Sequence, residues 1–300
     1  MTRVGIVGFG NIGKGVYEAI SAAPDFELAG VIKHKRDIKI PKGDGPEVLV
    51  VDMGDIKKLG KVDIVILCTP SRGVAEIAPQ YHELGISTVD SYDIHDGIWD
   101  LKTKFDISTK KNNVVSLLSV GWDPGSDSII RALFECMAPQ GKTYTNFGPG
   151  MSMGHTVAVK AVKGVKKALS VTIPKGEGLH RRMVYIEIED GFNFDEVADN
   201  IKKDPYFVKD ETHVFKENNV DSIIDLGHAS HILRKGVSGI THNQFFEYRS
   251  KANNPALTAQ VMLSSARAAM KQKPGCYTMI EIPTIDYLYG EKEDLIRHLV

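Results

Sequence analysis

Two aspartates stand where they could handle the amino group of a substrate. Asp93 and Asp123 each follow an apolar stretch that predicts a buried strand. Two carboxylates at one sheet edge could bind an ammonium group and accept its proton before a hydride leaves the adjacent carbon. They would also raise each other's pKa, which suits a proton acceptor near neutral pH. Taken singly, each fits a turn residue better, and Asp123 precedes Pro124-Gly125 as in an Asx turn.

An arginine could bind the other end of an acidic substrate. Arg182 begins an alternating run, residues 182–189, and a guanidinium can hold a carboxylate through two parallel hydrogen bonds. A surface arginine is the simpler interpretation. Five further candidates also have simpler roles: Thr172 as a residue of a facing strand, His228 as a structural strand histidine, Asn254 as a helix N-cap, and Phe147 and Met153 as core residues.

A glycine-rich stretch near the N-terminus has the spacing of a dinucleotide-binding loop. Gly8, Gly10 and Gly13 form G-x-G-x-x-G between a predicted strand and a predicted helix, the context that supports the motif. The first glycine permits a tight turn, the second lets the backbone approach a pyrophosphate, and the third lets helix and strand pack closely. Free N–H groups at the helix start, around Asn11 and Ile12, would bind phosphate. A turn without a ligand is the alternative.

The end of the second predicted strand indicates which dinucleotide would bind. A site for NAD usually has an acid there to hold the ribose 2′-hydroxyl. Here the strand runs into Lys33-His34-Lys35-Arg36, and a cationic cluster suits a 2′-phosphate, so we predict NADP. A solvated basic loop is the alternative.

Three more strand ends are expected at the same edge as the glycine loop. They are Thr69-Pro70-Ser71, Asp90-Ser91-Tyr92-Asp93 and the segment GWDPG at residues 121–125. In open α/β sheets, ligands bind outside the carboxyl ends of the strands. The sequence therefore predicts one crevice that collects these side chains.

Alternating strands and helices position this crevice. Apolar runs without polar alternation predict buried parallel strands at 3–8, 27–32, 62–68, 86–92 and 114–120. Helical spacing occupies 11–24 and 72–85, where Pro79 is expected to kink or split the helix. This order predicts a Rossmann-type, doubly wound parallel sheet over residues 1–121.

A second domain is expected from residue 122 to residue 253. After a helix at 126–138, longer alternating runs at 167–173, 182–189, 222–233 and 243–250 predict a mainly antiparallel sheet. We interpret this α+β domain as the substrate-binding and dimerisation part. A strong helix begins at residue 254, and residues 254–300 are expected to pack back on the first domain.

Composition excludes several classes of function. The chain has 300 residues and a net charge of −1, which suits two domains and gives no basic excess for nucleic acid. No apolar run is long enough for a bilayer, and the N-terminus has no signal-peptide pattern. Three widely spaced cysteines in apolar segments indicate buried thiols in a reducing cytoplasm. No histidine or cysteine spacing indicates a metal site, and no G-x-S-x-G or P-loop motif occurs.

Taken together, these motifs resemble the meso-diaminopimelate dehydrogenase family over nearly the whole chain. The matching segments are GFGNIG, TVDSYDIH, GWDPGSDSIIRAL, NFGPGMSMGH, THNQ, NNPALTAQ and QKPGCYTMIEIP. The resemblance implies reversible, NADP-dependent oxidative deamination of the D-centre of meso-2,6-diaminopimelate. The products are L-2-amino-6-oxopimelate, which cyclises to tetrahydrodipicolinate on the route to lysine, and ammonia. It also implies a homodimer.

The resemblance assigns residues to each ligand. The reacting D-end would meet Asp93, Trp122, Asp123, Met153 and the backbone of Gly154, with Phe147 in the pocket. The distant L-end would meet Thr172, Arg182, His228 and Asn254. The cofactor positions would be Gly8, Gly10, Asn11, Ile12, Gly13, Lys33, His34, Lys35, Thr69, Pro70, Ser71, Ser91 and Tyr92.

Three positions depart from the family pattern. HDGI has Asp96 one place early and Gly97 where relatives carry an acid, which puts the role of that acid in doubt. His34 replaces a common arginine, so the preference for NADP could soften at high pH. SMGH, with Met153, resembles the branch that also accepts simple 2-oxo acids.

Two rival functions stay open at the level of sequence. One is an NADP-dependent dehydrogenase for other D-amino acids or 2-oxo acids, and the other is a non-catalytic NADP-binding sensor. A doubled polar set, one for each end of a dicarboxylate, separates the proposed enzyme from both.

Overall fold

The computed structural model describes residues 1–33, 48–224 and 227–300. The chain divides into two compact units: residues 1–129 with 255–300 form unit 1, and residues 130–254 form unit 2. The first border lies beyond the expected one at 121/122. The reason is that the start of helix α4 (Ser126–Met137) still belongs to unit 1, where Ile129 packs against the core.

Unit 1 is built on a parallel sheet, as the sequence predicted. Its strand order is β14-β6-β5-β4-β1-β2-β3, and every pairing in it is parallel. The chain runs outward from β1 through β2 to β3, then returns to the other side of β1 at β4. The strands are β1 (Thr2–Val7), β2 (Phe26–Lys33), β3 (Val50–Asp52), β4 (Ile64–Leu67), β5 (Ser87–Asp90), β6 (Val115–Leu117) and β14 (Gly275–Tyr277).

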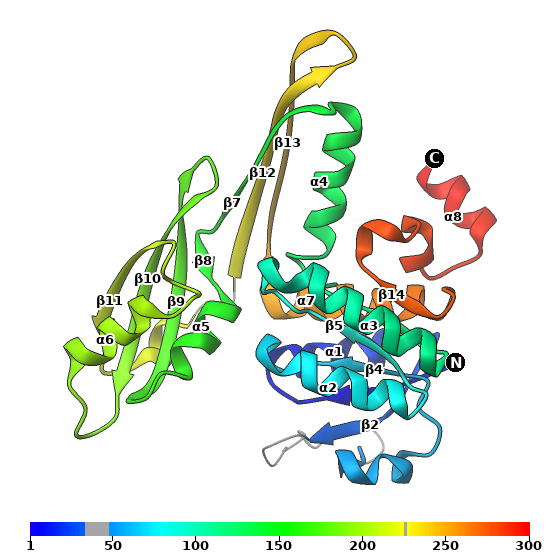
Figure 1. Cartoon of the computed structure of the whole chain (residues 1–300), viewed down its shortest axis with the longest axis horizontal. Coiled ribbons are helices and arrows are strands. Elements are labelled where there is room, and N and C mark those ends of the chain that lie inside the picture. The colour runs from blue at the N-terminus through cyan, green and yellow to red at the C-terminus, as the bar shows by residue number, and fades with distance from the viewer. Residues whose placement is uncertain (34–47, 225–226) are drawn as a thin grey trace. The chain divides into compact units, whose positions relative to one another are not determined.

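Helices cover both faces of this sheet (Figure 1). One core contains residues of α1 (Asn11–Ala22) and α7 (Asn254–Ala269), and the other contains residues of α2 (Ser71–Glu83) and α3 (Ile98–Asn112). Side chains of a strand alternate between the two cores. Ile64 and Ile66 lie in the first, while Val65 and Leu67 lie in the second. This explains why the buried strands show no polar alternation.

Two details of unit 1 differ from the sequence-based expectation. Helix α2 continues through Pro79, so the helix is not split there, although proline removes one helical N–H. Strand β14 joins the sheet beside β6, but its three residues were too short to produce a recognisable pattern. Residues 255–300 therefore add the strand β14 and the helices α7 and α8 to unit 1. The remaining short elements of this unit are η1 (Met53–Leu59), η2 (His95–Gly97), η4 (Met279–Glu281), η5 (Thr284–Tyr287) and α8 (Lys292–Leu299).

Unit 2 contains two sheets. One has the order β11-β10-β9-β8 and the other β13-β12-β7. All their pairings are antiparallel except β10 with β11, which is parallel. The mainly antiparallel class is thus confirmed. The strands are β7 (Gln140–Phe147), β8 (Gly150–Met151), β9 (Val165–Gly176), β10 (Leu179–Ile188), β11 (Glu211–Lys216), β12 (Gly227–Ser238) and β13 (Thr241–Asn253), and the helices are α5 (Met153–Lys160), α6 (Phe194–Lys203) and the short η3 (Val220–Ile223).

The predicted strand at residues 222–233 was wrong in its first part. Val220–Ile223 form the 3-10 helix η3, and β12 begins only at Gly227. The apolar pair Ile223-Ile224 resembles a strand start, but Ile223 ends η3 and Ile224 is its C-cap residue. His228, expected in the middle of this strand, is therefore the second residue of β12.

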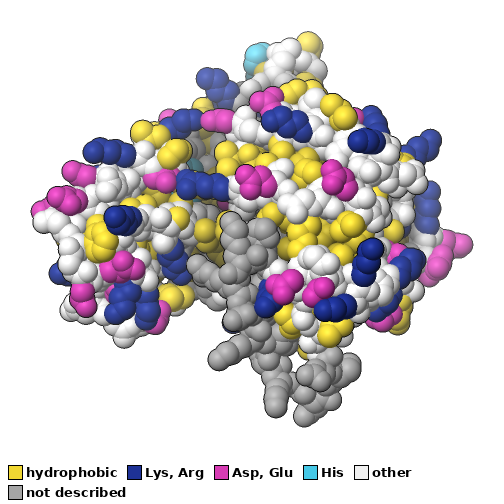
Figure 2. Space-filling view, turned by 60° about the horizontal axis from the view of Figure 1, so that its bottom comes forward, with side chains coloured by type: hydrophobic (Ala, Val, Ile, Leu, Met, Phe, Trp, Pro, Cys, Tyr) yellow, Lys and Arg dark blue, Asp and Glu magenta, His cyan; other side chains and the backbone are white. Residues whose placement is uncertain are grey.

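The surface carries charges of both signs. Figure 2 shows Lys/Arg and Asp/Glu side chains interspersed over the visible face, as a net charge of −1 leads one to expect. Among the described residues, none of the helices has the length and apolar content required to cross a membrane. The prediction of three buried thiols was wrong for Cys136, which is exposed on α4, because its apolar neighbours include the exposed Leu133 and Met137.

Candidate active site

The glycine loop has the geometry that its spacing predicted. Gly8 follows β1 with φ +86°, a left-handed conformation that favours glycine. A Cβ atom at Gly13 would lie 2.4 Å from the carbonyl oxygen of Gly8, so only glycine allows α1 to start this close to the strand. The backbone thus requires two of the three glycines.

Gly10 is different, because the fold does not require it. A Cβ at this position would meet no heavy atom within 4 Å, and Gly10 is the exposed N-cap of α1. A side chain there would fill the space in front of the helix N-terminus, where an anion is stabilised. The loop therefore fits a pyrophosphate that approaches the backbone beside Asn11 and Ile12.

The second strand ends in a cation that already has a partner. The ammonium of Lys33 lies 3.7 Å from a carboxylate oxygen of Asp52, since these residues are register neighbours at the ends of β2 and β3. Lys33 is thus placed at the expected strand end with part of its charge balanced. The predicted partners His34 and Lys35 lie outside the described residues.

The next two strand ends are joined to each other. The hydroxyl of Ser71 donates to Oδ1 of Asp93 over 2.6 Å and accepts the backbone N–H of Asp93 over 3.2 Å. Ser71 is the first residue of α2, directly after Thr69-Pro70. This pair fixes the carboxylate of Asp93 at the carboxyl edge of the sheet.

The loop after β6 is closed on itself. The N–H of Gly121 donates to the carbonyl of Pro124, and the N–H of Ser126 donates to the carbonyl of Gly121. A Cβ at Gly125 would lie 1.9 Å from the latter oxygen, so glycine is required. Trp122 is buried with 5% of its surface exposed, whereas Asp123 is half-buried. Because β5 and β6 are adjacent, the loops that carry Asp93 and Asp123 follow neighbouring strands.

The departure at HDGI has a steric explanation. A Cβ at Gly97 would lie 2.7 Å from the hydroxyl oxygen of Tyr92. Tyr92 is buried and packs in the second core, so it cannot move aside easily. Glycine at position 97 makes room for this phenol. Ser91, which directly precedes Tyr92, is half-buried.

Arg182 is the centre of the polar set in unit 2. Its Nε donates to Asp210 over 2.6 Å, and its NH1 donates to the hydroxyl of Thr172. Thr172 lies opposite Arg182 on β9, and Asp210 directly precedes β11. Only 7% of Arg182 is exposed. A guanidinium has five N–H donors, and two of them make these bonds, which orient the group.

Three aromatic rings stand beside this arginine. The Phe147 ring centroid lies 6.4 Å from that of His228, nearly parallel to it, and 5.4 Å from that of His180. The N–H of Phe147 donates to Nε2 of His180 over 2.8 Å, so that nitrogen is unprotonated. Burial, together with the charge of Arg182, lowers the pKa of His228 to about 4. Both imidazoles are therefore neutral at physiological pH.

The other predicted residues of unit 2 lie at element starts. Met153 and Gly154 begin α5, and Met153 packs against the small apolar cluster around Met151. Asn254 follows β13 at the sheet end where His228 pairs with Ala252, and it is the first residue of α7.

Comparison with known proteins identifies the family. The chain is 57% identical over 298 residues to a meso-diaminopimelate D-dehydrogenase of Bacteroides fragilis, covering 99% of both chains. The chain belongs to the meso-diaminopimelate D-dehydrogenase family. The resemblance noted in the sequence is thereby confirmed.

Family models and solved structures agree with this membership. Residues 121–254 match the diaminopimelic acid dehydrogenase C-terminal domain, and residues 3–93 match the semialdehyde dehydrogenase NAD binding domain. The solved C. glutamicum DAP dehydrogenase in complex with DAP is 29% identical, with a TM-score of 0.89 and coverage of 100% of this chain and 99% of that one. An engineered D-amino acid dehydrogenase bound to NADP+ is 28% identical, with a TM-score of 0.90 and the same coverage. This member of the meso-diaminopimelate D-dehydrogenase family is an oxidoreductase with an NAD(P)-type nucleotide-binding domain.

Three polar residues near the site had no sequence signal strong enough to select them. Asp210 precedes a strand that was not predicted, and His180 precedes the alternating run that was. Asp90 was expected at the strand end together with Ser91, Tyr92 and Asp93, but only Asp93 was assigned a part in the chemistry. Knowledge of the pairing of β9, β10 and β11 would have revealed Asp210.

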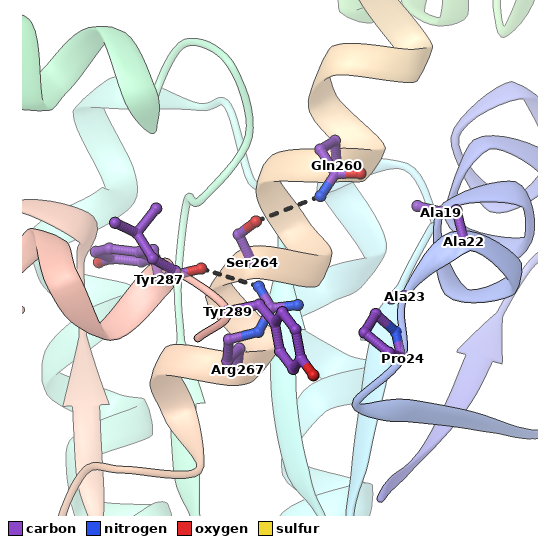
Figure 3. Close-up of a pocket in the computed structure, with 10 residues that line it drawn as sticks. Ala19, Ala22, Ala23, Pro24, Gln260, Ser264, Arg267, Tyr287 and Tyr289 are labelled. Atoms are coloured by element: carbon purple, nitrogen blue, oxygen red, sulfur yellow. Dashed lines mark hydrogen bonds between the residues drawn. The ribbon is translucent and has the colours of Figure 1, made fainter. Parts of the chain in front are cut away.

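A separate cavity of about 300 Å³ lies in unit 1. Figure 3 shows Arg267 and Tyr289 facing Ala22 and Pro24 across it. This is the C-terminal end of α1, opposite to the glycine loop. Arg267 is bound by Asp25 and by the carbonyl of Tyr287. Because the cavity and the glycine loop lie at opposite ends of α1, the cavity is not part of the nucleotide site.

Proposed function

We propose that the chain catalyses the reversible, NADP-dependent oxidative deamination of the D-centre of meso-2,6-diaminopimelate in lysine biosynthesis. Water is consumed, and L-2-amino-6-oxopimelate and ammonia are released. The observation that carries the proposal is the doubled polar set: Asp93 held by Ser71 in unit 1, and Arg182 held by Asp210 and Thr172 in unit 2.

The set around Arg182 is suited to the distant L-end of the substrate. A buried guanidinium with a fixed orientation can bind a carboxylate through two hydrogen bonds. Phe147 and the neutral His228 supply an apolar wall and a polar edge beside it. This set distinguishes a dicarboxylate from a simple amino acid.

The carboxylates of unit 1 are suited to the reacting D-end. An ammonium group must lose a proton before the adjacent carbon can release a hydride. Asp93, or Asp123 on the neighbouring loop, would accept that proton, directly or through water. NADP+, when bound, would supply the hydride acceptor. Trp122 would form the wall beside the reacting carbon.

The preference for NADP over NAD rests on the basic segment that begins at Lys33. The ammonium of Lys33 lies 3.7 Å from the carboxylate of Asp52, which holds it at the strand end. A 2′-phosphate would compete with Asp52 for this ammonium. We expect kcat/KM to be at least ten-fold higher with NADP+ than with NAD+. Equal values would remove the assignment of this segment to the 2′-phosphate.

The test of the function is a set of isomers assayed by nicotinamide absorbance. Meso-diaminopimelate, its LL and DD isomers and simple D-amino acids are compared at saturating NADP+. Activity on the meso form alone, or strongest on it, supports the proposal. Preference for simple D-amino acids supports the first rival, and inactivity with every compound supports a non-catalytic NADP-binding protein.

A broader substrate range is proposed from Met153. A thioether at the start of α5 packs against apolar neighbours and would tolerate a substrate end without a polar partner. The likeness to an engineered D-amino acid dehydrogenase supports this. Reductive amination of simple 2-oxo acids tests it, with Met153→Gln expected to reduce that activity several-fold.

A homodimer is proposed from exposed apolar side chains in unit 2. Leu133, Met137 and Phe245 are 51%, 39% and 57% exposed, and α4 packs on the sheet that contains β13 through Phe134 and Phe246. Covering these side chains with a second copy would bury apolar surface. The molar mass in solution, measured by light scattering, tests this proposal.

A further inference from the structure

One fully buried acid near the candidate site has no role in the function proposed so far. Asp90 is the last residue of β5 and has 0% of its surface exposed. Its Oδ1 accepts the backbone N–H of Tyr92 over 2.9 Å and that of Ser119 over 3.1 Å. A single oxygen atom thus binds two segments that are far apart in the sequence.

These two segments carry the candidate proton acceptors. Tyr92 directly precedes Asp93, and Ser119 precedes the closed loop that contains Trp122 and Asp123. Ser119 has φ +60°, an uncommon conformation for a residue with a side chain. The adjacent N–H of Val120 donates to the carbonyl of Asp90 over 2.9 Å. Asp90 therefore holds the exit of β6 through both its backbone and its side chain.

Burying an acid at this place is costly. Among the described residues, Oδ2 of Asp90 has no hydrogen-bond partner. Burial raises the pKa of Asp90 to about 7, although the two N–H groups oppose this shift. An apolar residue would be cheaper to bury, so the carboxyl group is explained by what it holds rather than by stability.

We propose that Asp90 is a positioning residue that ties the loop carrying Asp93 to the loop carrying Trp122 and Asp123. The proposal rests on the proposed function for its consequence, because misplaced acceptors slow proton removal from the substrate. The tie itself is a property of unit 1. It does not involve the glycine loop or the strand end at Lys33.

The first experiment measures kinetics of Asp90→Ala, Asp90→Asn and a matched control. Ser116→Ala is the control, since Ser116 is equally buried on β6 and accepts a hydrogen bond from Thr88 without holding either loop. We expect Asp90→Ala to lower kcat at least ten-fold, with KM for NADP+ changed less than two-fold. Asp90→Asn should recover most of kcat, because its amide oxygen can accept both N–H bonds. Ser116→Ala should keep kcat within two-fold.

The second experiment is hydrogen exchange, which needs no substrate. In Asp90→Ala, peptides that contain the amides of Tyr92 and Ser119 should exchange at least ten-fold faster than in the wild type, and faster than in Ser116→Ala. If only one segment, or neither, changes, the tie is overturned even in a protein without catalytic activity. Where Asp90→Ala does not fold, Asp90→Leu replaces it. Equal loss of kcat in Asp90→Ala and Ser116→Ala would overturn the positioning role, whereas an inactive wild type would refute only the proposed function.

Discussion

The two units hold their polar groups by different means. In unit 1 the acids at the strand ends are held by main-chain N–H groups and one hydroxyl: Asp90 by Tyr92 and Ser119, and Asp93 by Ser71. In unit 2 the central charge is held by side chains of neighbouring strands, since Arg182 binds Asp210 and Thr172. One set is anchored to the backbone and the other to an ion pair.

From this difference we expect the chemistry to take place at the acids of unit 1 and the recognition of the distant carboxylate at Arg182 of unit 2. In unit 1 the backbone donors hold Asp90 between the two loops that carry Asp93 and Asp123, so these candidate proton acceptors keep their places. An ion pair across strands leaves spare donors on the guanidinium, which suits recognition of a second carboxylate. Substitutions in unit 1 should therefore act on kcat, and those in unit 2 on KM for the amino acid.

The largest effect is expected at Asp123. Asp123→Asn removes a proton acceptor while it preserves shape, and general base catalysis contributes roughly 10²–10⁴-fold. We expect a loss of that order in kcat/KM, measured by steady-state kinetics with meso-diaminopimelate. Asp100→Asn, an exposed acid in the first turn of α3, is the control. Near wild-type turnover in Asp123→Asn would mean that Asp123 is only a turn residue and not a proton acceptor.

Arg182→Ala should give the next largest effect. It removes the proposed carboxylate anchor and leaves the carboxylate of Asp210 without its cation. KM for meso-diaminopimelate should rise about 100-fold, as 1.4 kcal/mol is tenfold in affinity, while KM for NADP+ changes less than two-fold. Arg181→Ala is the control, since Arg181 pairs with Glu211 at the surface. An equal rise in KM for meso-diaminopimelate and for NADP+ would contradict the assignment of Arg182 to the L-end.

Asp210→Asn should act in the same direction and more weakly. The amide oxygen still accepts the hydrogen bond from Nε of Arg182, but the charge that fixes the guanidinium is lost. We expect KM for meso-diaminopimelate to change about ten-fold at unchanged kcat, since a charge-assisted bond is roughly twice as strong as a neutral one. The adjacent Glu211→Gln, which alters the surface pairs with Lys175 and Arg181, should leave both constants near wild type.

The smallest effect is a pair of opposite pH dependences of stability. Burial raises the pKa of Asp90 to about 7, so the folded state binds a proton that the unfolded state has lost. Stability therefore falls as pH rises from about 4 to about 7. Burial lowers the pKa of His228 to about 4, so the unfolded state binds the extra proton, and stability falls as pH drops from about 6.5 to about 4.

Two variants separate these contributions. Relative to wild type, Asp90→Asn should gain melting temperature as pH rises through the first window, and His228→Gln should gain it as pH falls through the second. Differential scanning calorimetry across both windows checks this. Parallel curves for wild type and Asp90→Asn would show that Asp90 does not titrate in the folded protein.

The nucleotide half was predictable because its signals are local. Gly8 and Gly13 are required by a turn and a close approach within six residues, and Gly10 can be understood only from the ligand. The parallel order followed from the alternation of apolar runs and helices. The substrate half was less predictable, because β11 and the short helix η3 have weak patterns of their own.

By itself, the sequence determined the doubly wound sheet, the glycine loop, the residues at the strand ends and the family. Short-range backbone preferences and the periodicity of apolar residues suffice for these. Only the tertiary structure decided that Ser71 binds Asp93, that Asp210 fixes Arg182 and that Asp90 holds two loops. The contacts of Ser71 with Asp93, Asp210 with Arg182 and Asp90 with Ser119 each join residues more than 20 positions apart, and strand register sets such contacts rather than any local pattern.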